Sequence, residues 1–379
     1  MPFSKLNLNA ELTQKLIDKG YEKPYPIQQQ AIPAILKERD VLGIAQTGSG
    51  KTASFVLPIL NNFKQSEKDK NRLVDVLILV PTRELAVQVD GVFKEFNEAL
   101  KKPAIVKAVY GGVSINPQMK GLYGVNILIA TPGRLIELVN AKALGLNKIN
   151  TLVLDEADKM LNLDFKDEMD AILKMLPKKR QNLLFSATLS DKVKEINQMV
   201  LNQPIILNIK PKETNLEIIQ QLAYSVEAEH KGPLLRHLIS TENLQQVLVF
   251  TSSTFKADNV AAKLRKNNIQ ATAIHSKKSQ GARTAALRKF KEGSLRVLVA
   301  TDLLARGIDI EFLPCVINFE LPRSPKDFVH RIGRTGRAEN PGKAITFFGS
   351  EEEHHFKVIQ KKMKKQVDVE DGDKIVLSL

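Results

Sequence analysis

Short runs of Val, Ile and Leu recur along the chain, and each is followed by polar or turn-forming residues. Such runs are typical of parallel strands that helices cover on both faces. Amphipathic stretches between them, such as residues 256–266, predict those helices. The runs form two series: Val41–Ala45, Leu77–Val80, Ile127–Ala130, Leu152–Leu154 and Leu183–Phe185, then Val247–Phe250, Thr272–Ile274, Val297–Ala300, Val316–Phe319 and Ile345–Phe348.

The segment between the two series, Lys210–Asn215, is polar and has no periodicity, which is typical of a linker between domains. We therefore expect an α/β protein with two tandem domains. Each domain should be a mostly parallel β-sheet flanked by helices. The predicted boundaries are 1–209 for the first domain, 210–216 for a short flexible linker and 217–379 for the second domain.

The composition supports a folded protein rather than a disordered one. Hydrophobic residues make up 43% and charged residues 26% of the 379 residues, which is ordinary globular usage. The apolar runs are shorter than the roughly 18 residues that a membrane-spanning helix needs, and the N-terminus lacks the apolar stretch of a signal peptide. These features predict a soluble, cytoplasmic protein.

The net charge of the chain favours one class of binding partner. The chain has 56 basic and 42 acidic residues, a net charge of +14, which favours a polyanionic partner such as nucleic acid. Its one cysteine, Cys315, lies in an apolar run and has no second thiol for a disulfide or a zinc site. We expect Cys315 to be a buried packing residue.

A phosphate-binding loop follows the first apolar run. Gln46-Thr47-Gly48-Ser49-Gly50-Lys51-Thr52 precedes a helix predicted from about Ala53, and matches the pattern G-x-x-x-x-G-K-[ST] with Ala45 in place of the first Gly. Backbone N–H groups of residues 48–52 should hold phosphates, Lys51 should reach the β and γ phosphates, and Thr52 should bind Mg²⁺. The alternative, a chance Gly-rich turn, is disfavoured by the strand before it and the helix after it.

Carboxylates follow the fourth run, in Asp155-Glu156-Ala157-Asp158. Asp155 suits a Mg²⁺ ligand, and Glu156 can orient or deprotonate an attacking water. The alternative role, acids that complement the dipole of a helix N-terminus, stays open for Asp158.

These four residues resemble the motif that names the DEAD-box family of ATP-dependent RNA helicases, and the other family motifs occur in order. In the first domain they are the Q motif at Gly20-Tyr21-x-x-Pro24-x-Pro26-Ile27-Gln28 with Phe3 upstream, the RNA-facing elements Pro81–Ala86, Gly111-Gly112 and Thr131–Arg134, and the coupling motif Ser186-Ala187-Thr188. In the second domain they are Gln280-x-x-Arg283, Ala300-Thr301-Asp302, Arg306–Asp309 and His330–Arg337.

The resemblance implies two RecA-like domains and one ATP between them. It implies that Lys51, Asp155 and Glu156 act with the arginine fingers Arg334 and Arg337. It further implies that Ser186, Thr188 and His330 couple the phosphate state to domain closure, although a purely structural hydrogen bond stays open for His330. The nucleotide contacts it implies are Phe3, Tyr21, Gln28, Gln46, Thr47, Gly48, Ser49, Gly50, Lys51, Thr52, Gly307 and Asp309.

For RNA, the resemblance implies contacts to phosphates and sugars by Arg83, Gly112, Thr131, Arg134, Arg283 and Thr301. Such contacts read no base sequence. The activity implied is ATP hydrolysis, with ATP and Mg²⁺, coupled to local unwinding of short RNA duplexes or remodelling of RNA–protein complexes. Partners could include ribosome assembly or RNA-degradation proteins, and the protein should be a monomer that does not bind membranes.

Longer stretches at 111–119, 179–186 and 278–283 resemble the bacterial RhlE-type group. Two features depart from the family: Tyr25 stands where Thr is usual, and the chain ends soon after the second domain, so we expect no auxiliary RNA-binding tail. Two other functions stay open. A DNA-directed motor would share Lys51 and Asp155, and a clamp without turnover would bind RNA alone.

Overall fold

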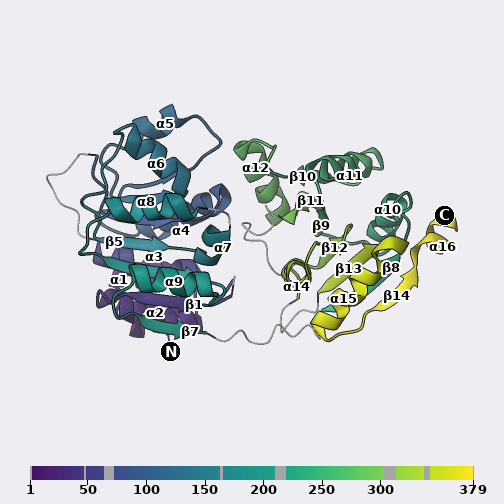
Figure 1. Ribbon diagram of the computed structural model, residues 1–379, viewed down its shortest axis with the longest axis horizontal. Coiled ribbons are helices and arrows are strands. Elements are labelled where there is room, and N and C mark those ends of the chain that lie inside the picture. The colour runs from purple at the N-terminus through teal and green to yellow at the C-terminus, as the bar shows by residue number, and fades with distance from the viewer. Residues whose placement is uncertain are drawn as a thin grey trace. The chain divides into compact units, whose positions relative to one another are not determined.

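The computed structural model describes residues 2–46, 48–63, 72–162, 165–209, 219–302, 313–336 and 342–378. The chain divides into two compact units, Met1–Pro211 and Lys212–Leu379. Each unit contains a seven-stranded sheet in which every described pairing is parallel, with helices packed against it (Figure 1). The predicted fold class is confirmed. The whole of the predicted linker, residues 210–216, lies outside the described residues.

The sheet of the first unit has the strand order β3-β4-β2-β5-β6-β1-β7. Side chains alternate between its two faces, so that Leu152 and Val153 of one strand enter separate hydrophobic cores. The elements are η1 (Phe3–Lys5), α1 (Ala10–Asp18), α2 (Pro26–Leu36), β1 (Val41–Ile44), α3 (Lys51–Asn62), β2 (Val76–Leu79), α4 (Arg83–Asn97), β3 (Val106–Val109), α5 (Ile115–Lys120), β4 (Ile127–Ala130), α6 (Pro132–Asn140), β5 (Thr151–Leu154), α7 (Ala157–Asn162), α8 (Lys166–Met175), β6 (Gln181–Ser186), α9 (Asp191–Val200) and β7 (Ile205–Asn208).

The sheet of the second unit has the order β10-β11-β9-β12-β13-β8-β14. Successive residues Leu248 and Val249 again enter cores on opposite faces. The elements are β8 (Gln220–Ser225), α10 (Lys231–Thr241), β9 (Val247–Thr251), α11 (Thr254–Lys266), β10 (Ala271–Ile274), α12 (Gln280–Lys291), β11 (Val297–Thr301), β12 (Cys315–Asn318), α14 (Pro325–Ile332), β13 (Lys343–Phe348), η2 (Ser350–Glu352), α15 (Glu353–Met363), β14 (Asp368–Asp371) and α16 (Gly372–Leu377).

All ten predicted runs coincide with strands, but β3, β7, β8 and β14 were not predicted. Three of these four are edge strands, which carry polar or exposed residues because one side of the backbone faces no further strand. All four residues of β14 are exposed, and β8 reads as the polar sequence QQLAYS. Strands β8 and β14 therefore lack the apolar run on which the prediction depended, whereas β7, with the sequence IILN, has a short apolar run that the prediction missed.

Two smaller expectations have clear outcomes. Helix α3 begins at Lys51 rather than near Ala53, so the lysine belongs to the first turn of the helix. Cys315 is buried and has no disulfide partner, as predicted, and burial raises the pKa of its thiol to about 12. Among the described residues, no helix is long and apolar enough to cross a membrane.

Candidate nucleotide and RNA sites

The predicted site residues of the first unit divide into two groups along one edge of its sheet. The phosphate-binding loop, the Asp-Glu-Ala-Asp segment and the coupling motif follow β1, β5 and β6, which are neighbours in the order β5-β6-β1. The RNA-facing elements follow β2, β3 and β4, which are neighbours in the order β3-β4-β2. Ligands of open parallel sheets bind at the carboxyl ends of the strands, where both groups lie.

The phosphate-binding loop joins β1 to the N-terminus of α3. Gly48 and Gly50 have φ angles of +77° and +85°, in the left-handed region that glycine adopts most readily. The Lys51 side chain is buried and donates to the carbonyl oxygens of Ala45 at 2.6 Å and Gln46 at 2.8 Å. Burial lowers the pKa of Lys51, while the nearby Asp155 carboxylate opposes that shift. The ammonium group is thus held inside the loop, where a phosphate would lie.

The Q motif contacts this loop through Gln28. The buried Gln28 side chain accepts from the Tyr25 N–H at 2.8 Å and donates to the Gly50 carbonyl at 3.2 Å. A Cβ on Gly50 would lie 2.5 Å from Gln28 Nε2, so the close approach requires glycine. Because Gln28 contacts the main chain of Tyr25, the unusual side chain at position 25 leaves this contact unchanged.

The two aromatic residues expected near the base lie against each other. Phe3 is buried, and the Phe3 and Tyr21 ring centroids are 6.4 Å apart with the rings edge to face. Tyr21 packs in turn against Phe96, at 5.8 Å. The N-terminal segment is therefore attached to α4 by aromatic contacts, and Tyr21 keeps about a third of its surface exposed, 36%.

Asp155 and Glu156 are both buried at the end of β5. Burial raises the pKa of Asp155 to about 7, and the neighbouring Glu156 adds to that shift. Glu156 has a φ of +53°, and its Oε1 accepts from Lys159 at 2.7 Å, while its Oε2 is buried without a hydrogen-bond partner. Two buried carboxylates with unused acceptor capacity suit a divalent cation and a polarised water.

The coupling motif contacts the Asp-Glu-Ala-Asp segment. The Thr188 hydroxyl donates to Asp158 Oδ2 at 3.2 Å. Ser186 is fully buried, and its hydroxyl donates to the Thr188 carbonyl at 2.8 Å. Asp158 thus lies in the first turn of α7, as the dipole interpretation requires, and also binds the coupling motif.

The residues of the first unit that are predicted to face RNA converge on the loop after β3. Arg134 donates from its Nη2 to the Val113 carbonyl at 2.8 Å and pairs through Nε with Glu137 at 2.8 Å. Arg83 lies near the Gly112 carbonyl at 3.4 Å, and the Thr131 hydroxyl lies 3.4 Å from the Gly111 N–H. Arg134 is only 5% exposed, whereas Arg83 is half-buried.

In the second unit, the buried Arg331 is the centre of the polar contacts. Its Nε and Nη2 pair with the two carboxylate oxygens of Asp302 at 2.5 and 2.7 Å. Its Nη1 donates to Asn318 Oδ1 at 3.2 Å and to the Glu320 carbonyl at 2.6 Å. The guanidinium also lies 4.9 Å from the Phe250 ring centroid. These contacts join α14 to the ends of β11, β9 and β12.

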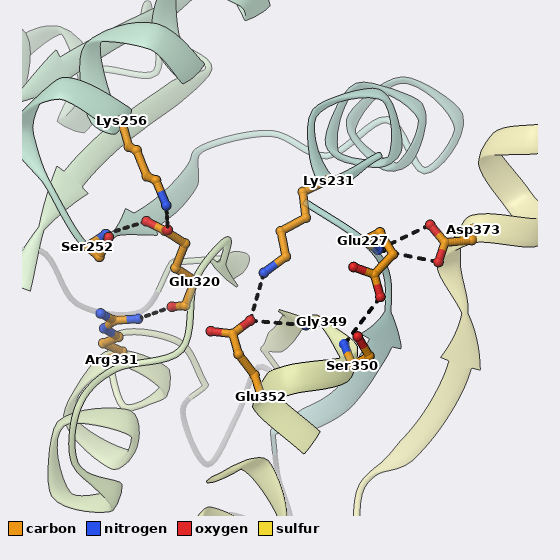
Figure 2. Close-up of polar contacts among 10 residues, drawn as sticks. All are labelled: Glu227, Lys231, Ser252, Lys256, Glu320, Arg331, Gly349, Ser350, Glu352 and Asp373. Carbon is orange, nitrogen blue, oxygen red and sulfur yellow. Dashed lines mark hydrogen bonds and ion pairs between the residues drawn. The ribbon is translucent and has the colours of Figure 1, made fainter. Parts of the chain in front are cut away.

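Glu320 extends this network to the start of α11. Figure 2 shows Ser252, Lys256 and Arg331 all bonded to Glu320. The carboxylate accepts from the Ser252 N–H at 2.7 Å and from Lys256, and these bonds lower the pKa of Glu320 against the opposing effect of its burial.

Of the other predicted residues of this unit, Thr301, His330 and Arg334 lie close to that network in sequence, and Arg283 does not. Thr301 ends β11, directly opposite Thr251. Arg283 is buried and donates to Gln280 at 2.6 Å, and Arg334 is buried as well, while His330 is exposed. Four predicted site residues lie outside the described residues: Thr47, Gly307, Asp309 and Arg337.

Several residues of these sites had no predicted role, namely Arg331, Glu320, Lys256 and Gln118. Arg331 lies inside the quoted motif His330–Arg337, and Gln118 lies inside the quoted stretch 111–119, which were the available signals. Lys256 and Glu320 contact each other across many positions of the chain, and local sequence carries no sign of that contact.

Comparison with known proteins identifies the family. The profile of the DEAD/DEAH box helicases matches residues 25–196, and that of the helicase conserved C-terminal domain matches residues 230–339. The DEAD-box ATP-dependent RNA helicase CshA of Bacillus subtilis is 38% identical over 367 residues, 97% of this chain and 73% of that protein. This chain belongs to the DEAD-box family of ATP-dependent RNA helicases. The CshA of Streptococcus pneumoniae is similar at 40% identity, over 97% of this chain and 69% of that protein.

Solved structures agree with this assignment. Dbp5 of S. cerevisiae, bound to RNA and ADP BeF3, matches with a TM-score of 0.83 and 29% identity over 100% of this chain and 99% of that one. A DEAD box protein of Methanococcus jannaschii matches with a TM-score of 0.54 and 35% identity, over 98% of this chain and 99% of that one. The two sheets are therefore RecA-like domains of an RNA helicase. The similarity to CshA points away from the predicted RhlE-type group, because the quoted stretches lie in or beside motifs that the whole family shares.

Proposed function

We propose that this helicase binds RNA largely without sequence preference and couples ATP hydrolysis to local unwinding of short duplexes or remodelling of RNA–protein complexes, as a CshA-like enzyme. The observation that carries the proposal is the division of one sheet edge. Nucleotide motifs follow β5, β6 and β1, and RNA motifs follow β3, β4 and β2. On this proposal, one sheet carries both the ATP site and the RNA site of the first unit.

In the nucleotide half, Lys51 would bind the β and γ phosphates, and the backbone N–H groups at the start of α3 would hold them. Asp155 and Thr52 would hold Mg²⁺ together with phosphate oxygens, which suits the preference of Mg²⁺ for few protein ligands. The ion would supply charge neutralisation on the phosphates. Glu156, with its unpartnered Oε2, would orient or deprotonate the attacking water.

In the second unit, Arg334 and Arg337 would act as arginine fingers, and Gly307 and Asp309 would contact the nucleotide. RNA would bind to Arg83, Gly112, Thr131 and Arg134 of one unit and to Arg283 and Thr301 of the other. We infer that both ligands together favour a closed form, since contacts that form only there shift the population toward it. Ser186, Thr188 and His330 would transmit the phosphate state.

Phosphate release tests this function. The protein is incubated with ATP and Mg²⁺ alone, with an RNA strand, and with a DNA strand of the same sequence. RNA should stimulate release far more than DNA, because the 2′-hydroxyl distinguishes the two at a fixed site. Equal stimulation by DNA would favour a DNA-directed motor, and RNA binding without phosphate release would favour a clamp.

Closure has its own test. Distances between spectroscopic labels, one on each unit, should shorten when RNA and a non-hydrolysable ATP analogue are added together. An unchanged distance would contradict the closure mechanism.

Three further expectations stay predictions: association with ribosome assembly or RNA-degradation proteins, a monomeric state and a cytoplasmic location. Purification of the native protein with its bound partners, after separation of the cell into its fractions, would check all three.

A further inference from the structure

The loop after β3 that is predicted to face RNA is anchored by Gln118, which lies in the quoted stretch 111–119 but had no predicted role. Gln118, near the end of α5, accepts from the Tyr110 N–H at 3.0 Å and donates to the Tyr110 carbonyl at 3.1 Å. Gln118 is 9% exposed, whereas residues 112–114 of the loop are exposed. The buried Gln118 amide thus binds both backbone polar groups of Tyr110, the residue that begins the loop.

The position of β3 explains why a side chain makes these bonds. Strand β3 is the edge of its sheet and pairs only with β4, so its outer backbone groups face no further strand. The Gln118 amide takes the place of that missing strand at Tyr110. On the other side, the Thr131 N–H donates to the Val109 carbonyl at 3.2 Å. The backbone entering the loop is therefore held on both sides.

The loop beyond this point has a demanding conformation. Gly112 has a φ of +74°, and a Cβ there would collide with the Arg83 guanidinium. The Val113 carbonyl accepts from Arg134. An exposed backbone that must present its groups to RNA benefits from being ordered beforehand, since ordering one backbone residue on binding costs about 1–2 kcal/mol.

We propose that Gln118 is a positioning residue that holds the Gly111–Val113 loop ready for RNA. This inference rests on the proposed RNA contact of Gly112. It assigns Gln118 no contact with RNA and no part in ATP hydrolysis. Its effect should appear in the RNA concentration that half-saturates the ATPase, and the KM for ATP at saturating RNA should stay that of the parent.

The chain offers a matched control at the opposite end of the same strand. Asn97 donates to the Ala104 carbonyl at 2.8 Å and accepts from the Ala104 N–H at 2.8 Å. Asn97 is also 9% exposed. It therefore makes the same pair of bonds to one residue, but at the amino end of β3, away from the predicted RNA-facing edge.

The experiment compares Gln118→Met with Asn97→Leu, both of which keep the approximate length of the side chain and lose both bonds. Each should lower the Tm, because each leaves one backbone N–H and one carbonyl without its partner. Only Gln118→Met should raise the half-saturating RNA concentration, by roughly 5- to 30-fold, the factor that corresponds to reordering one backbone residue. It should also speed hydrogen exchange at residues 110–114, measured by mass spectrometry.

Gln118→Glu provides a second variant should Gln118→Met fold poorly, since a carboxylate keeps the bond from the Tyr110 N–H and loses the other. Its effect on half-saturating RNA should be intermediate. An unchanged value in both Gln118 variants, or an equal rise in Asn97→Leu, overturns the inference. Gly112→Ala separates the two proposals: a rise there with none in the Gln118 variants removes only the positioning role, and no rise in any of them removes the RNA contact of the loop as well.

Discussion

The Thr188 hydroxyl donates to Asp158 across 3.2 Å and so joins the coupling motif after β6 to the carboxylate segment after β5. The two strands are neighbours in the sheet, with Leu184 opposite Leu154. Asp158, the last carboxylate of the segment, is therefore in direct contact with the predicted coupling motif. If phosphates bind at Asp155 and Glu156 as proposed, this hydrogen bond gives them a short route to Thr188.

Thr188→Val should disconnect hydrolysis from unwinding, because it removes the hydroxyl and keeps the shape of the side chain. A hydrogen bond to a charged group contributes about 1.5–3 kcal/mol. We expect RNA-stimulated phosphate release to fall much less than the rate of duplex separation, measured together on one labelled duplex. Thr188→Ser, which keeps the hydroxyl, is the control. Equal losses of both rates in Thr188→Val would contradict this role.

Lys51→Ala should abolish ATP hydrolysis, since no other cation is placed inside the phosphate-binding loop by the described contacts. The bonds from Lys51 Nζ to the Ala45 and Gln46 carbonyls are lost as well, so the empty loop should also become less ordered. Nucleotide affinity and phosphate release would both be measured. Tight ATP binding by the variant would show that the β and γ phosphates lie elsewhere.

Glu156→Gln should differ from Lys51→Ala by keeping nucleotide binding, because it removes the negative charge of one side chain and keeps the shape of the site. The amide oxygen can still accept from Lys159, and Asp155 still carries its carboxylate. ATP and RNA should bind as in the parent, while kcat falls by about 10²–10⁴, the usual contribution of a general base. Single-turnover rates with pre-bound RNA would measure this. Hydrolysis at the parent rate would exclude a water-activating role for Glu156.

The sequence was sufficient for the parts of the molecule whose chemistry is local. Buried parallel strands carry apolar runs, and the phosphate-binding loop requires Gly, Lys and Thr at fixed spacing, so β1 and Lys51 were predictable. The contact of Gln118 with Tyr110 was not, since it depends on β3 being an edge strand. Edge strand β14, all of it exposed, has no pattern of its own.

The contacts of Arg331 with Asp302 could likewise not be predicted from the sequence. Its motif suggested a nucleotide site, yet its described contacts are to Asp302, Asn318 and Glu320 within its own unit. Arg331→Met should destabilise the protein by about 1–3 kcal/mol, because it removes the bidentate partner of the half-buried Asp302 and the donor to the buried Asn318. Thermal and urea unfolding would measure this loss. The double variant Arg331→Met with Asp302→Leu should recover part of it, and a double variant no more stable than the single one would show that the pair is not the cause.

Arg83 and Arg134 should differ in how they affect RNA binding, because the charge of Arg134 is paired with that of Glu137. Arg134 is buried and paired with Glu137, whereas Arg83 is half-buried and makes one long contact to a carbonyl. Binding to single strands weakens with salt by a slope of about −0.7 per neutralised phosphate. Arg83→Ala should reduce that slope by about one phosphate. Arg134→Ala should weaken binding to every RNA sequence alike, with a smaller change in slope. Glu137 already balances the charge of Arg134, and the bond from Arg134 to the Val113 carbonyl shapes the loop.

Titrations of parent and variants with several RNA sequences, across a salt series and with an ATP analogue, would measure both slopes. A larger loss of slope in Arg134→Ala than in Arg83→Ala would mean that Arg134 leaves Glu137 to bind a phosphate directly.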